Sequence, residues 1–83
     1  MTAIIDRVRQ IAAKHLGVEL EKVTPDGTPE ALQGDSLDRV ELTMALEDQF
    51  GIAISDDEAD QARTFADFAT LIEAKATAQA AAA

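Results

Sequence analysis

Few side chains in this 83-residue sequence could do chemistry, and a serine among acidic residues stands out. Ser36 follows Asp35 at the start of a helical pattern, where unpaired backbone N–H groups favour a phosphate. A catalytic serine would need a neighbouring base and an oxyanion hole. The only histidine, His15, falls on the apolar face of another helix, where we expect a half-buried structural role. Because no histidine lies beside Ser36 in the sequence, we predict no catalytic residue. Since Asp35 can cap the helix, Ser36 is not needed as a cap, and we interpret it as an attachment point.

A hydrolase is the first alternative, because Gly34-Asp35-Ser36-Leu37 matches the signature of a family of esterases and lipases. Those enzymes resemble much longer α/β proteins, with an Asp-x-x-His pair near the C-terminus that this sequence lacks. A nucleophile elbow would also need glycine at position 38, which is aspartate. The sequence therefore disfavours ester hydrolysis.

Metal and phosphate sites of known spacing are not found in the sequence. There is no cysteine, one histidine and no Gly-rich phosphate loop. The acidic residues of segment 56–60 lack the loop spacing and central glycine of a calcium-binding EF-hand. We predict no metal site, and any bound Ca²⁺ or Mg²⁺ would be opportunistic.

The charge is strongly acidic and concentrated in one segment. The net charge is −9, and residues 35–60 hold nine acidic residues against one basic residue, Arg39. Such a charge repels nucleic acids and anionic membrane surfaces and favours partners rich in Lys and Arg. No apolar run is long enough to span a membrane, so we expect no membrane insertion and a cytoplasmic location.

The elements that position these residues are predicted to be helices of one small domain. Apolar residues at helical spacing predict helices over 4–16 and 36–50, closed by Gly17 and Gly51. A long loop separates them. Ser55 opens a short third helix that ends near 61–63, and Thr64 caps a fourth helix that runs to about residue 75. The fold class is thus all-α, a small four-helix bundle with a long first loop and a short third helix. We place the domain at 1–76 and expect the Ala-rich tail, 77–83, to fray.

The second helix has two apolar faces. At 100° per residue, Leu42, Leu46 and Phe50 form a core stripe. A second stripe on the opposite side comprises Leu37, Val40 and Met44, bordered by Glu41, Glu47 and Asp48. Loop residues such as Val23 or Leu32 could cover part of it. An uncovered apolar stripe rimmed by carboxylates would suit transient docking of a basic partner.

From Ile4 to about Lys75 the sequence resembles the acyl carrier protein family. The resemblance is carried by Asp35-Ser36-Leu37-Asp38, Val40-Glu41-Leu42, Met44-Ala45-Leu46-Glu47 and Phe50-Gly51-Ile52. It implies a monomeric carrier, not an enzyme, on which a phosphopantetheinyl transferase attaches 4'-phosphopantetheine from coenzyme A to Ser36, beside Asp35. Acyl groups would be held as thioesters and delivered to fatty-acid, lipid or polyketide-type biosynthetic enzymes with basic docking patches.

The resemblance also assigns roles to two groups of residues. The implied docking residues are Leu37, Asp38, Val40, Glu41, Met44, Glu47 and Asp48. The implied walls of a shelter for the acyl chain are Leu46, Ile54, Ala59, Ala62, Phe68 and Ile72.

Two departures from the family pattern leave alternatives open. Gly34 stands next to Asp35, as in peptidyl carrier domains, and Arg39 places a cation within the docking helix, where we expect it to weaken or redirect docking. A peptidyl-type carrier and an unmodified acidic adaptor of the same fold are the alternatives, and the adaptor would not need Ser36.

Overall fold

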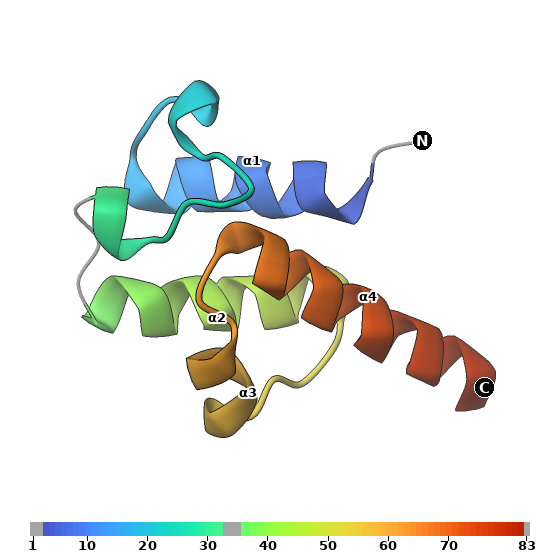
Figure 1. Cartoon of the computed structure of the whole chain (residues 1–83). Helices are drawn as coiled ribbons and strands as arrows, with labels where there is room; N and C mark the ends of the chain where they lie inside the picture. Colours follow the sequence, from blue (N-terminus) through green and yellow to red (C-terminus); the bar gives the residue numbers. More distant parts are fainter. Residues whose placement is uncertain (1–2, 33–35, 83) are drawn as a thin grey trace.

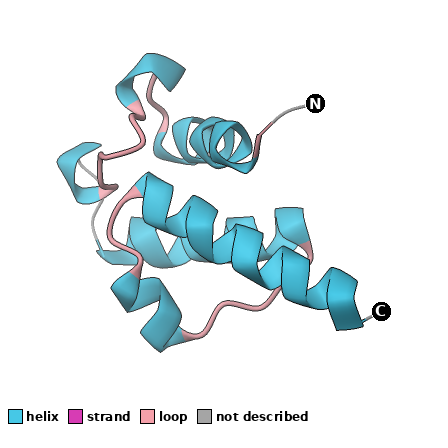
Figure 2. Ribbon diagram, turned by 45° about the vertical axis from the view of Figure 1, so that its right-hand side comes forward, coloured by secondary structure: helices cyan, strands magenta, loops and turns pink. Residues whose placement is uncertain are grey.

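The computed structural model describes residues 3–32 and 36–82, which form only helices and connecting loops. Figure 1 shows the arrangement and Figure 2 the same chain coloured by secondary structure. The elements in chain order are α1 (Ile4–Leu16), the 3₁₀ turns η1 (Leu20–Lys22) and η2 (Glu30–Leu32), α2 (Ser36–Phe50), α3 (Asp56–Gln61) and α4 (Phe65–Ala82). The predicted all-α bundle with a long first loop and a short third helix is confirmed.

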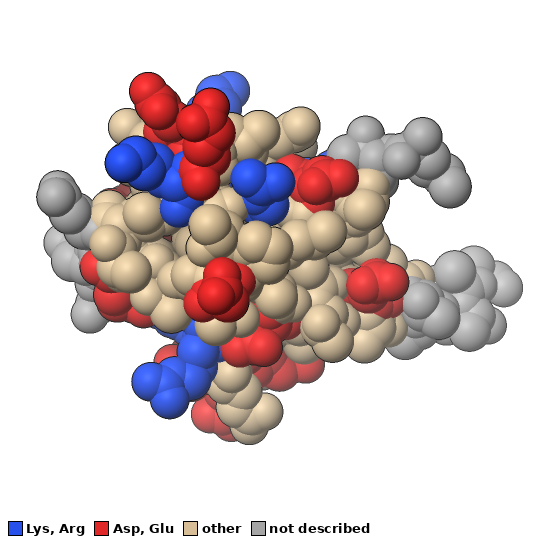
Figure 3. Space-filling model, turned by 45° about the horizontal axis from the view of Figure 1, so that its top comes forward, with Lys and Arg blue, Asp and Glu red and all other residues tan. Residues whose placement is uncertain are grey.

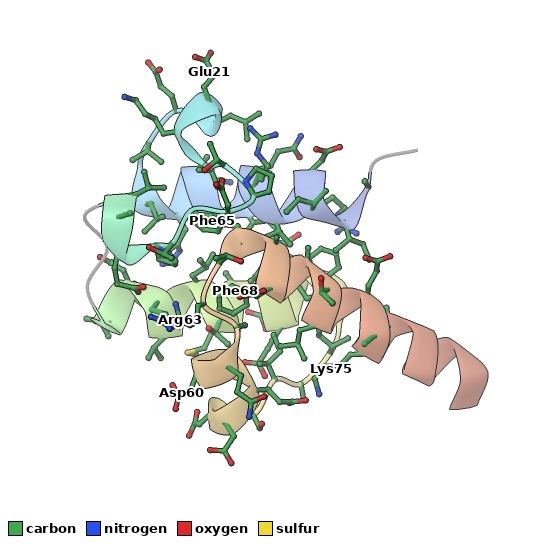
Figure 4. All side chains as sticks on the ribbon, in the orientation of Figure 1. Glu21, Asp60, Arg63, Phe65, Phe68 and Lys75 are labelled. Atoms are coloured by element: carbon green, nitrogen blue, oxygen red, sulfur yellow. The ribbon has the colours of Figure 1, made fainter. Side chains whose placement is uncertain are left out.

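The core lies where α1, α2 and α4 meet, with the first loop adding to it. Phe65 and Phe68 at the start of α4 are fully buried (Figure 4). They belong to a single cluster, which confirms that the predicted apolar faces turn inward. The other members with no exposed surface are Val8, Ala12, Val23, Leu42, Leu46 and Ile72.

Glycines in the left-handed conformation end both α1 and α2. Gly17 has φ 68° and Gly51 has φ 64°, a region that side chains with a Cβ rarely adopt. The N–H groups of Gly17 and Val18 both donate to the carbonyl of Ala13, which satisfies the end of α1. These closures turn the chain sharply and fix the ends of the two helices.

The first loop is attached to both α1 and α4 through backbone groups. Arg9 on α1 donates to the carbonyl oxygens of Leu20 and Val23. At the other side, the N–H of Phe65 donates to the carbonyl of Gly27 at 3.0 Å. The loop therefore helps to position α4, and it is part of the bundle rather than a free spacer.

Side chains cap α3 and α4 as their sequences predict. Ser55 and Glu58 form a reciprocal capping box at α3. At α4, the Asp67 carboxylate accepts from the N–H groups of Arg63 and Thr64, both at 3.1 Å, and the Thr64 hydroxyl accepts from the N–H of Asp67. Lys75 Nζ lies 2.9 Å from Glu58 Oε1 and joins α4 to α3 (Figure 4).

These caps make the fold sensitive to acid. The backbone N–H of Thr64, with that of Arg63, holds the pKa of Asp67 below its ordinary value because both donate to the charged carboxylate. The folded state therefore binds the proton more weakly than the unfolded state. The contribution of Asp67 to stability is present above the ordinary aspartate pKa and is lost as the pH falls through the lowered one.

We expect Asp67→Asn to flatten the fall in melting temperature below about pH 4, the ordinary range of an aspartate. Thermal denaturation followed by circular dichroism between pH 6 and pH 2.5 measures this slope. Asp57→Asn removes an exposed carboxylate from the first turn of α3 and is the matched control. An equal flattening in the two variants would contradict the assignment to the α4 cap.

The last helix continues further than we expected. We predict a helix that runs to about residue 75, whereas α4 continues to Ala82; fraying of the tail 77–83 stays a prediction. Alanine has the highest helix propensity, which favours continuation of the helix through the Ala-rich segment.

Candidate attachment and docking site

Ser36 is the first residue of the 15-residue helix α2. The first backbone N–H groups of an α-helix have no partner within the helix, and the helix dipole favours negative charge there. Position 36 is therefore suited to carry a phosphodiester. The predicted cap, Asp35, lies outside the described residues, so its role stays a prediction.

The second apolar stripe of α2 is exposed. Leu37, Val40 and Met44 show 63%, 55% and 58% of their surface to solvent, whereas Leu42 and Leu46 on the other side show none. The loop residue Val23 is itself buried in the core and Leu32 packs against the core. The prediction that α2 has one buried and one uncovered apolar face is confirmed.

The acidic residues along this helix are placed differently from one another. Asp48 is exposed. Glu47 is partly buried, and its carboxylate accepts a hydrogen bond from the N–H of Ile54 at 2.8 Å. Glu47 therefore holds the chain between α2 and α3 in addition to contributing negative charge beside the stripe.

A histidine lies close to two of the predicted docking acids. His15 Nε2 on α1 lies 3.4 Å from Glu41 Oε2 on α2. Asp38 completes a group whose possible ligand atoms all lie within 4.8 Å of one another, and such a group could hold a divalent cation. The sequence indicated a half-buried His15, but not this neighbourhood, because nothing local in it encodes the register between α1 and α2.

Arg39 does not belong to the exposed stripe. Its Nη2 group donates to the carbonyl oxygens of Ala59, at 2.8 Å, and Ala62 at the end of α3. Its Cζ lies 5.3 Å from the centre of the Phe68 ring, and its Nη1 lies 3.5 Å from Glu30 Oε1. The structure shows this cation turned inward, where it fastens α3 to α2; its effect on docking stays a prediction.

The residues predicted to shelter an acyl chain are mostly in the core. Leu46, Phe68 and Ile72 are fully buried, Ala62 is 4% exposed and Ile54 is 8% exposed. Ala59 is partly buried. Ile54 and Ala59 also line a surface groove of about 410 Å³ between α2 and α3. The remaining residues of this groove are Arg39, Val40, Thr43, Met44, Glu47, Asp56 and Asp60.

Charge is distributed unevenly over the surface. Figure 3 shows a face on which Lys and Arg side chains lie among Asp and Glu. By contrast, Arg39 is the only basic residue of segment 35–60, and its guanidinium is bonded to carbonyl groups of α3. Segment 35–60 therefore keeps an excess of negative charge beside the stripe, because its single basic side chain is directed toward α3. No helix among the described residues combines the length and hydropathy needed to cross a membrane.

A comparison with protein families identifies the family of the chain. The family model described as "Phosphopantetheine attachment site" matches residues 6–72, which include Ser36, the exposed stripe and both walls of the groove. The chain therefore belongs to the acyl carrier family, whose members carry covalent 4'-phosphopantetheine and are not themselves enzymes.

Proposed function

We propose that Ser36 carries the phosphopantetheine and that the chain delivers acyl thioesters to fatty-acid, lipid or polyketide-type biosynthetic enzymes in the cytoplasm. The observation that carries this proposal is the position of Ser36 at the start of α2, directly before the exposed stripe. An enzyme that docks on the stripe reaches the attachment point without a change in the bundle. The phosphopantetheine supplies the thiol on which acyl groups are held.

The residues of the chain have separate tasks in this function. The first turn of α2 provides N–H groups and dipole for the phosphodiester. Leu37, Val40 and Met44 supply the apolar contact area, and the acidic residues Asp38, Glu41, Glu47 and Asp48 favour enzymes with basic patches. The partners are a phosphopantetheinyl transferase and acyl-handling enzymes, and the carrier acts as a monomer.

Tethering explains why a small protein without catalytic groups can be useful. A bound cargo meets each docked enzyme at a high effective concentration, which is set by the length of the arm rather than by diffusion. Docking must also be reversible, because the same surface serves successive enzymes. A stripe of three exposed apolar residues with a charged rim suits such weak and steered association.

We expect a single phosphopantetheine adduct, in full conversion, when the purified chain is incubated with coenzyme A and a broad-specificity phosphopantetheinyl transferase. Intact-mass spectrometry measures the product. Ser36→Ala should give no adduct, while Ser55→Ala, which removes the only other serine, should be modified like the parent. No adduct on folded protein would favour the unmodified adaptor, and an adduct on Ser36→Ala would contradict the assignment of the residue.

A peptidyl-type carrier is the second candidate, favoured by Gly34 directly before Asp35. The two candidates share the attachment chemistry and differ in cargo. Comparing acyl and aminoacyl loading enzymes on the modified chain distinguishes them. If only aminoacyl groups are transferred to the modified chain, the chain is a peptidyl-type carrier rather than an acyl carrier.

A further inference from the structure

The groove between α2 and α3 lies on the same face of α2 as the attachment point. Position 36 and the groove residues Val40, Thr43 and Glu47 fall within about 60° of one another around the helix axis at 100° per residue. The groove begins about one turn from position 36 and follows the helix for some 10 Å, at 1.5 Å per residue. A group attached at Ser36 can therefore reach it without passing around the bundle.

Arg39 lies between this groove and the buried Phe68. It lines the groove, and its guanidinium lies over the Phe68 ring while it donates to the carbonyls of Ala59 and Ala62. The main chain of Arg39 is bonded in turn, since its carbonyl accepts from the Thr43 hydroxyl at 2.9 Å. An acyl chain could pass at this point only if the guanidinium gave up its carbonyl partners.

The core residues near Arg39 are fully buried. Leu46, Phe68 and Ile72 have no exposed surface. Close-packed interiors resist the insertion of additional methylene groups, because neighbouring side chains must leave their favoured conformations. Entry of a long chain would thus combine the loss of charge-assisted hydrogen bonds with the displacement of packed side chains.

The groove itself is a small site of mixed character. Its volume of about 410 Å³ is at the lower end of the range for small-molecule sites. Val40, Met44, Ile54 and Ala59 provide apolar contact. Its other side chains include the carboxylates of Glu47, Asp56 and Asp60, which repel an anionic group.

We propose that this surface groove, rather than the interior, holds the acyl chain, and that Arg39 restricts the sheltered cargo to short, uncharged chains. This inference rests on the proposed attachment at Ser36. It assigns Arg39 as a specificity-determining residue, and it makes Ile54 and Ala59 the only residues of the predicted shelter that contact the cargo.

The experiment compares chains loaded with acetyl, butanoyl, octanoyl, dodecanoyl and succinyl phosphopantetheine from the corresponding coenzyme A thioesters. Intact mass establishes loading first, so that a failure to load bears on Ser36 and not on the groove. The readouts are the melting temperature and the NMR chemical shifts of methyl and amide groups.

We expect the melting temperature to rise from acetyl to butanoyl and then to remain level through dodecanoyl. Shifts should change at Val40, Ile54 and Ala59 and not at Leu46 or Ile72. Succinyl, with the four carbons of butanoyl and a terminal carboxylate, should give no rise. A continued rise with octanoyl and dodecanoyl, with shift changes at Leu46 and Ile72, would overturn the proposal, as would unchanged groove shifts in every form.

Arg39→Met tests the barrier directly. In this variant the octanoyl form should melt above the acetyl form, with new shift changes at Leu46. Arg63→Met removes an exposed cation just beyond the end of α3 and should behave like the parent chain. If Arg39→Met does not fold, the series on the parent chain decides the question by itself. If Arg39→Met folds and its melting temperature still does not rise beyond the butanoyl form, the proposal that Arg39 restricts the length of the cargo is contradicted.

Discussion

Leu37→Glu is expected to lower kcat/KM for the phosphopantetheinyl transferase by about ten- to a hundredfold, the range of an interface residue worth roughly 1.4 to 2.7 kcal/mol. Leu37 is the most exposed member of the stripe and directly follows Ser36. Glutamate removes its apolar contact and places a solvated carboxylate at the centre of the interface. The measurement is the initial rate of modification at several carrier concentrations.

The fold should not change in this variant, because Leu37 is 63% exposed and acidic residues are favourable in the first turn of a helix. Gln49→Glu adds the same charge at an exposed position near the other end of α2 and is the matched control. Equal kcat/KM values for the two variants would show that the stripe is not used in docking. Leu37 does not line the groove, so the result is independent of where the cargo lies.

Phe65→Ala is expected to reduce the free energy of unfolding by about 3–5 kcal/mol, as for other fully buried phenylalanines. Phe65 has no exposed surface and begins α4. Its ring also lies against the first loop, where a Cβ built on Gly27 would be 3.7 Å from its Cε2 atom. The substitution therefore removes contacts from both the core and the loop that positions α4.

Urea denaturation followed by circular dichroism measures this loss. Small domains have about 5–15 kcal/mol of total stability, so the variant should be partly unfolded in water if the parent lies near the lower limit. Phe65→Leu retains much of the apolar volume, so its free energy of unfolding should fall clearly less than that of Phe65→Ala. If Phe65→Ala reduced the free energy of unfolding by less than about 1 kcal/mol, the surrounding side chains would have filled the space left by the ring, which would contradict a tightly packed core at this position.

The bounds of the helices, apart from the C-terminal end of α4, could be predicted because their signals are local. Gly17 and Gly51 end helices in the left-handed conformation, and the Ser55 and Thr64 caps lie within three residues of their partners. The two-faced character of α2 follows from the spacing of its apolar residues alone. These features need no knowledge of how the helices are packed.

The features that the sequence did not predict depend on contacts between distant segments. Arg39 bonds to residues 20 and 23 positions away, and its sequence neighbours do not indicate whether its side chain points outward or inward. The approach of His15 to Glu41 likewise results from the packing of α1 on α2. The cap at Asp35 falls outside the described residues and is neither supported nor contradicted.

The placement of α4 beside α1 has a consequence for synthesis of the chain. The two helices contact each other although a long stretch of sequence separates them, and α4 supplies Phe65, Phe68 and Ile72 to the core. Val8 and Ala12 on α1, which is synthesised before α4, therefore lack one of their core partners until α4 has emerged from the ribosome. Contacts of this kind slow folding because a large loop must close first. The bundle can therefore be completed only after α4 has been synthesised.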